Sequence, residues 1–155
     1  LEQGLVARGS DFSNAIINLA RNNATERNLP EELLKQQSIY DLQPEQDSAD
    51  LVVCCEVMEH LEQPEEALRV LQKITSQYVI FSVPREPIWS ITNMARGKYW
   101  TDFGNTPGHI QRWSQREFIQ LVSCYFDVIQ IPLTHLHNER LLLFSGLLLH
   151  PLSQF

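Results

Sequence analysis

The chain has 155 residues, a formal net charge of -7 and 43% hydrophobic residues. This length suits one domain with an ordinary core, and the composition excludes disordered, collagen-like and disulfide-rich proteins. The acidic balance disfavours binding to nucleic acid or to an anionic membrane surface, because both require a basic protein surface.

Three cysteines, Cys54, Cys55 and Cys124, have no spacing typical of metal ligands. We therefore expect no metal site, and we expect a reduced protein of the cytoplasm. The apolar run at 141–149 is shorter than the roughly 20 residues that cross a bilayer, so it predicts a buried strand and no membrane span.

The first elements in chain order are a short strand over Leu5–Arg8 and a helix over 14–26. Gly4 would end a preceding helix, and Ser13 is a suitable N-cap for the next one. Apolar residues recur on one face of that helix, at Ile16, Ile17, Leu19, Ala20 and Ala24. A further short strand is expected within Leu33–Tyr40.

The middle of the chain alternates strand and helix. The apolar run Asp50–Cys55 predicts a strand buried on both faces of a parallel sheet. Pro64 then begins a helix whose buried stripe is Ala67, Leu68, Leu71 and Ile74. A second buried strand follows at Tyr78–Val83.

The last third is less regular until residue 113. A helix is expected at 87–96, followed by an aromatic loop. Ser114 and Glu117 form a capping box that begins the next helix, with Trp113 and Phe118 as its hydrophobic staple. Strands are expected at 126–131 and 140–149. The pattern predicts one α/β domain over 1–155, with a largely parallel sheet and an antiparallel last strand.

Ligands of open α/β sheets bind at the carboxyl ends of the strands, so the residues after each strand are the candidates for a site. Asp11 follows the first strand and precedes a helix. Its carboxylate would either accept hydrogen bonds from a ribose or cap the helix, and its position alone does not decide between the two.

The segment Glu56–Leu61 after the second buried strand holds two carboxylates and an imidazole. It would bind a cation, act as acid and base through Glu56, Glu59 and His60, or be a solvated loop. Without further context the solvated loop is the favoured interpretation.

His109 lies between a glycine-containing loop and the capped helix, near Trp100, Phe103 and Trp113. Its imidazole would orient a substrate or take its proton, or it would only bind loop carbonyls. Both interpretations stay open.

Several strings, taken as an ordered set over roughly 4–131, resemble the class I S-adenosylmethionine-dependent methyltransferases, of the type 11-like kind. Residues 50–61 with 64–68 resemble the fourth-strand motif, and 9–13 with the following helix resemble the second strand. Residues 82–87 resemble the fifth-strand exit. The resemblance implies a Rossmann-like methyltransferase sheet, mostly parallel with a C-terminal antiparallel strand, and S-adenosylmethionine as cofactor.

The same resemblance implies a role for individual residues. Asp11 would bind the cofactor ribose, and Ser38 and Ile39 would lie beside the adenine, where the family usually has an aspartate. Glu56 would border the methionine end and the methyl-transfer cavity. The implied cofactor-binding residues are Asp11, Phe12, Ser38, Ile39 and Glu56, and the implied proton acceptors are His109 and His60.

The family's first strand and its Gly-rich loop have no counterpart here, so we interpret the chain as an N-terminally truncated fragment. Loss of a central strand would leave two neighbouring strands with unpaired backbone groups and would expose apolar surface. We accordingly expect weak or absent cofactor binding by this chain.

The predicted function is methyl transfer to a small-molecule acceptor, with 85–113 as a substrate-side cover. The alternative is a non-catalytic methyltransferase-like module that binds a partner, such as a second copy in a homo-oligomer. A nucleotide-dependent oxidoreductase is a weaker rival, because Glu56–Leu61 fits that class poorly.

Overall fold

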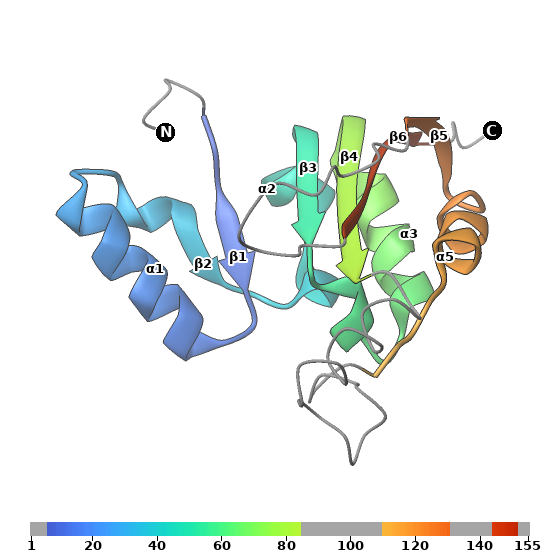
Figure 1. Cartoon of the computed structure of the whole chain (residues 1–155). Coiled ribbons are helices and arrows are strands. Elements are labelled where there is room, and N and C mark those ends of the chain that lie inside the picture. The colour runs from blue at the N-terminus through green and yellow to red at the C-terminus, as the bar shows by residue number, and fades with distance from the viewer. Residues whose placement is uncertain (1–5, 85–109, 131–143, 152–155) are drawn as a thin grey trace, which may run out of the picture.

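The computed structural model describes residues 6–84, 110–130 and 144–151 (Figure 1). The strands are β1 (Gly9–Asp11), β2 (Leu34–Gln36), β3 (Ala49–Cys55), β4 (Thr75–Pro84), β5 (Phe126–Gln130) and β6 (Phe144–Pro151). The α-helices are α1 (Asn14–Glu26), α2 (Pro44–Asp47), α3 (Pro64–Ile74) and α5 (Gln115–Val122). Short 3-10 helices are η1 (Glu31–Leu33), η2 (Ile39–Asp41) and η3 (Met58–His60). The cap expected at Gly4 and the helix expected at 87–96 lie outside the described residues.

The strands form two sheets, of order β1-β2 and β3-β4-β6-β5. β1 pairs with β2 in parallel, and β3 pairs with β4 in parallel. β6 runs antiparallel to both β4 and β5, so the predicted antiparallel member at the end of the chain is confirmed.

Local capping chemistry explains where the helices begin. Ser13 accepts the N–H of Ile16 at 3.4 Å as the N-cap of α1. Ser114 and Glu117 form the predicted capping box of α5, and the rings of Trp113 and Phe118 lie 5.3 Å apart as a staple. Both predicted helix starts are confirmed. They were predictable because their signals lie within one turn of sequence.

The first strand was predicted at Leu5–Arg8, and this position is wrong. β1 lies at Gly9–Asp11, and Val6 is 96% exposed. The strand is placed by its pairing with β2, in which Asp11 lies opposite Gln36. Within the predicted strand Leu33–Tyr40, only Leu34–Gln36 pairs as a strand. Ser38 is instead the N-cap of the 3-10 helix η2.

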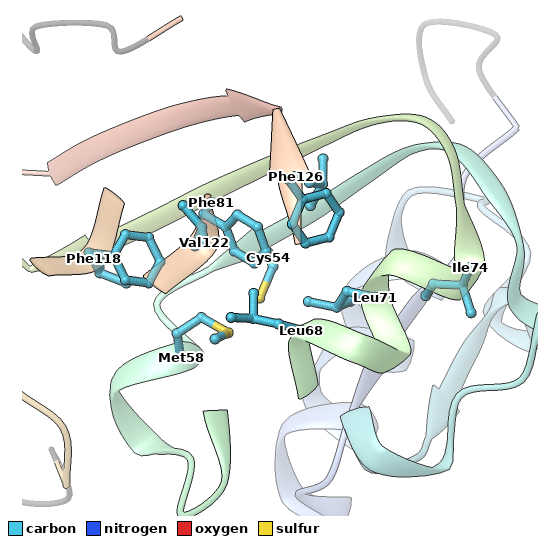
Figure 2. Close-up of a cluster of buried hydrophobic side chains, with 11 residues drawn as sticks. Cys54, Met58, Leu68, Leu71, Ile74, Phe81, Phe118, Val122 and Phe126 are labelled. Atoms are coloured by element: carbon cyan, nitrogen blue, oxygen red, sulfur yellow. The ribbon is translucent and has the colours of Figure 1, made fainter. Parts of the chain in front are cut away.

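The core lies between the four-stranded sheet and two helices. Side chains from β3, β4, β5, α3 and α5 converge there (Figure 2). The predicted stripe of α3 is confirmed, since all four of its residues are buried. Phe81 on β4 is the centre of this cluster, because its ring meets Phe118 at 6.0 Å and Phe126 at 5.9 Å, both edge to face.

Strand β3 is covered on one face only, which corrects the prediction of a strand buried on both faces. Cys54 is 5% exposed and belongs to the core, whereas Leu51 and Val53 on the other face are 49% and 59% exposed. Helix α1 likewise buries only part of its predicted face, since Ile16 and Leu19 are more than half exposed. Apolar side chains are therefore exposed on both β3 and α1.

The break between the two sheets lies between β1 and β3, each of which pairs on one edge only among the described strands (Figure 1). Arg8 joins the two sides, because its guanidinium donates to the carbonyl oxygens of Gln46 and Ser48, just before β3. The unpaired strands and exposed apolar side chains that the resemblance implied are thus found at β1 and β3.

We expect Phe81→Ala to lower the free energy of unfolding by about 3–5 kcal/mol, because it removes the ring at the centre of the core. Phe12→Ala is the matched control, since Phe12 is 76% exposed, and it should cost within about 0.5 kcal/mol. Urea unfolding of both variants measures the difference. Equal losses would contradict this view of the core.

Candidate functional site

The carboxyl ends of β1, β2, β3 and β4 point toward the same side of the molecule (Figure 1). At the end of β1, Asp11 accepts the N–H of Ser13 through Oδ1 at 2.7 Å, and its carbonyl accepts the N–H of Gln37 at 3.0 Å. Asp11 therefore does cap the turn into α1, while the bond to Ser13 uses only one of its two carboxylate oxygens.

Ser38 follows β2 and lies near Asp11, because the two strands are paired and in register. Its Oγ accepts the N–H of Tyr40 at 3.3 Å, which leaves its hydroxyl hydrogen for another acceptor. Phe12 is exposed beside Asp11, and Ile39 is half-buried and packs against the core. The structure thus brings the four predicted residues at the ends of β1 and β2 into one region.

Glu56 is the first residue after β3, and its backbone is strained. Its φ is 55°, in the left-handed region that non-glycine residues rarely adopt. Two bonds to Ser82 of β4 hold it, since its N–H donates to the Ser82 carbonyl at 3.0 Å and its Oε1 accepts the Ser82 hydroxyl at 3.0 Å. A strained, firmly held residue at a strand end is a common feature of functional sites.

Glu59 of η3 lies behind Glu56 and is only 2% exposed, so the favoured interpretation of a solvated loop is wrong for this residue. The carboxyl groups of Glu59 and Glu56 interact electrostatically. Neither carboxylate oxygen of Glu59 has a hydrogen bond of normal geometry to a described residue. Buried carboxylates are rarely left in this state without a partner.

The pKa of Glu56 is raised from 4.5 to about 7, mainly by burial and then by the charge of Glu59, while the Ser82 hydroxyl acts in the lowering direction. Burial also raises the pKa of Glu59. The carboxyl of Glu56 therefore takes up a proton near neutral pH.

His60 is the last residue of η3, with its Nε2 4.0 Å from Oε1 of Glu59 and its side chain 41% exposed. His109 lies outside the described residues. The predicted cover at 85–113 is described only from residue 110, where the N–H groups of Ile110 and Gln111 each donate to the Glu59 carbonyl at 2.9 Å. The end of this segment is thereby fixed beside the carboxyl pair.

In the part of the chain that the structure describes, His, Cys, Asp and Glu side chains form no group of three or more that would hold a metal ion. None of the helices described there combines the length and the apolar character needed to cross a bilayer.

The sequence alone did not reveal the contact of Glu59 with Glu56 or the role of Ser82. Ser82 could have been found from the sheet, since two parallel neighbouring strands place it opposite Cys55, next to Glu56. The burial of Glu59 has no local signal, and its backbone carbonyl is bound by residues 110–111, about 50 positions away.

Comparison with known proteins points to one family. A family model described as a methyltransferase domain matches residues 2–125. No curated protein matches the chain.

Solved structures share the fold at low identity. Magnesium protoporphyrin IX methyltransferase from Synechocystis PCC 6803, with bound SAH, has a TM-score of 0.70 at 18% identity, over 97% of this chain and 65% of its own. The PH0226 protein from Pyrococcus horikoshii OT3 has a TM-score of 0.72 at 14% identity, over 97% of this chain and 73% of its own. A S-adenosylmethionine-dependent methyltransferase from Clostridium acetobutylicum has a TM-score of 0.68 at 10% identity, over 94% of this chain and 75% of its own.

The chain thus spans about two thirds of the length of the Synechocystis enzyme. At these identities the likeness shows a shared Rossmann-like α/β fold.

The carboxyl pair predicts a dependence of stability on pH. Because the pKa of Glu56 is raised, the folded state binds more protons than the unfolded state between about pH 4.5 and pH 7. The free energy of unfolding should therefore fall as the pH rises through this window. Glu59→Gln removes one charge of the pair, so we expect it to reduce the fall between pH 5 and pH 8 by about 1–2 kcal/mol.

Urea unfolding at pH 5 and pH 8 measures this fall. Glu62→Gln is the control, since Glu62 is an exposed glutamate on the same loop. If both variants retained the same dependence on pH as the parent chain, the interaction between Glu56 and Glu59 would be disproved.

Proposed function

Because the chain belongs to the methyltransferase domain family, we propose that it serves methyl transfer from S-adenosylmethionine to a small-molecule acceptor. The observation that carries this proposal is that Asp11, Ser38 and Glu56 lie at or just after the carboxyl ends of β1, β2 and β3, which point toward the same side of the molecule. Open α/β sheets bind their ligands at such an edge. The match to the family model covers all three residues.

The residues at this edge suit the parts of the cofactor. Asp11 has one carboxylate oxygen beyond the bond to Ser13, and this oxygen would accept a ribose hydroxyl. The exposed ring of Phe12 and the half-buried Ile39 offer apolar surface for a purine, and the Ser38 hydroxyl would donate to it. Glu56 would stand at the methionine end.

When bound, the cofactor supplies a methyl group on a sulfonium, which is already a good leaving group. The protein then has to align the acceptor and, where the acceptor carries a proton, receive it. His60 is a candidate to receive a proton at this edge, because it is partly exposed beside Glu59. His109 is proposed for the same role from the sequence alone.

A small acceptor is favoured over a nucleic acid by the net charge of -7. The segment 85–113, rich in aromatic residues, is proposed to cover the acceptor. Its described end at Ile110 and Gln111 is bound to the Glu59 carbonyl, next to Glu56. This position suits a cover over the methyl-transfer cavity.

One observation favours a second candidate function, that of a non-catalytic binding module. β1 and β3 each have an unpaired edge among the described strands, and Leu51 and Val53 of β3 are exposed. An added strand from a partner would pair with such an edge. Cofactor binding distinguishes the two functions.

Titration of the amide NMR spectrum with S-adenosylhomocysteine tests the proposed function. We expect shifts at Asp11, Ser38 and Glu56, and this method detects even millimolar binding. Asp11→Asn replaces the carboxylate that would accept a ribose hydroxyl with a neutral amide. The affinity for S-adenosylhomocysteine should therefore fall about tenfold.

Asp127→Asn on β5 is the matched control and should leave the affinity unchanged, because Asp127 is exposed on the strand at the far edge of the sheet. Absence of shifts at millimolar S-adenosylhomocysteine would contradict cofactor binding by this chain and favour the binding module.

A further inference from the structure

The proposed cofactor site is divided between the two sheets of the molecule. Asp11 and Ser38 lie at the ends of β1 and β2, which form the two-stranded sheet, whereas Glu56 follows β3 of the four-stranded sheet. Among the described strands no backbone ladder joins the two sheets. A ligand that contacts all three residues therefore depends on the orientation of one sheet relative to the other.

Arg8 connects the two sheets at the beginning of their strands. It directly precedes β1, and its guanidinium donates through Nη1 to the carbonyl oxygen of Gln46 and through Nη2 to that of Ser48, the latter bond at 2.8 Å. Gln46 belongs to α2, and Ser48 is the C-cap of α2 and directly precedes β3. One side chain thereby holds the start of β1 against the start of β3.

The two bonds of Arg8 restrict orientation as well as distance. A guanidinium is planar and always charged, and its donors point in fixed directions. Bonds from both terminal nitrogens therefore limit a rotation of β1 that a single bond would permit. The turn that Arg8 binds is itself held, because the Asp47 carboxylate accepts the N–H of Gln43 at 2.9 Å and the side-chain amide of Gln37 at 3.2 Å.

A change of orientation at Arg8 would be felt at the proposed site. Asp11 is three residues further along, so an extended chain places it about 10 Å from Arg8. A tilt of β1 about its start would move Asp11 relative to Glu56, which Ser82 holds in the other sheet. A shift of about 1 Å is enough to impair the alignment of groups in a site.

We propose that Arg8 is a positioning residue of the cofactor site, which sets the orientation of Asp11 and Ser38 relative to Glu56. This inference rests on the proposed function and adds to it a residue that acts from outside the site. S-adenosylhomocysteine would span both sheets, with its ribose at Asp11 and its methionine end at Glu56. Adenosine would reach only the ends of β1 and β2. Arg8 therefore matters for the first ligand and little for the second.

Titrations of the amide NMR spectrum with S-adenosylhomocysteine and with adenosine test the proposal. Arg8→Ala removes both bonds, so its affinity for S-adenosylhomocysteine should fall about tenfold, while its affinity for adenosine should change by less than about twofold. The variant should remain folded, because the exposed Arg8 lies outside the core cluster. Equal losses for both ligands would indicate general structural damage and would overturn the proposal.

Two further variants separate the geometry of Arg8 from its charge. Arg8→Lys keeps the positive charge without the planar fork, so its affinity for S-adenosylhomocysteine should lie between those of the parent chain and Arg8→Ala. Full affinity in Arg8→Lys would show that charge alone attracts the ligand, and the positioning role would be wrong. Arg116→Ala is the matched control and should bind both ligands as the parent chain does, since Arg116 is an exposed arginine on α5, far from β1 (Figure 1).

The orientation of the two sheets is measured without any ligand from residual dipolar couplings of the amide groups. The couplings of residues 9–36 and 49–84 give the orientation of each range. Arg8→Ala should change the orientation of one range relative to the other, whereas Arg116→Ala should leave it as in the parent chain. An unchanged orientation in Arg8→Ala would contradict the proposal.

The two proposals fail in different ways. If the parent chain binds S-adenosylhomocysteine and Arg8→Ala binds it equally well, the proposed function stands and the role of Arg8 is overturned. If the parent chain does not bind S-adenosylhomocysteine, cofactor binding by this chain is contradicted. Arg8 then positions no cofactor site, even where the couplings show that it orients the sheets.

Discussion

The parallel pairing of β3 with β4 is the contact through which both the core and the candidate site are built. Its register sets Cys54 opposite Phe81 and Cys55 opposite Ser82. Cys54 and Phe81 then point into the core under α3, where Phe118 and Phe126 close around Phe81. One step further along the same strands, Ser82 binds Glu56 through both its carbonyl and its hydroxyl. The site therefore inherits its rigidity from the best-packed part of the molecule, as a functional site requires.

The packing is asymmetric, and this asymmetry has consequences for function. One face of the β3-β4 pair is covered by α3 and α5, whereas Leu51 and Val53 on the other face stay exposed. The β1-β2 sheet, which contains Asp11, is joined to the rest near β3 through the side chain of Arg8 rather than through a backbone ladder. A guanidinium at the surface tolerates more movement than a ladder does. The two halves of the proposed cofactor site are thus less firmly joined than either half is internally.

Features with a local chemical cause were predictable from the sequence. Pro64 begins α3, and Ser114 with Glu117 begins α5, because each signal acts within a single turn. Asp11 and Glu56 were predictable as strand-end residues for the same kind of reason. Features that depend on contacts between distant parts of the chain were not predictable from the sequence. The position of β1 depends on its pairing with β2, and the Glu59 carbonyl is bound by the distant N–H groups of Ile110 and Gln111. No periodicity in a single segment encodes such contacts.

The chemical identity of Glu59 is the strongest reason to assign the carboxyl pair a function. Glutamine has nearly the same shape, would fill the same space and would accept a hydrogen bond without carrying a charge. At 2% exposure a carboxyl is costly to ionise, and a glutamine would avoid that cost. The strain at Glu56 supports the same conclusion, since a left-handed backbone at a non-glycine residue is retained only where the surrounding contacts enforce it.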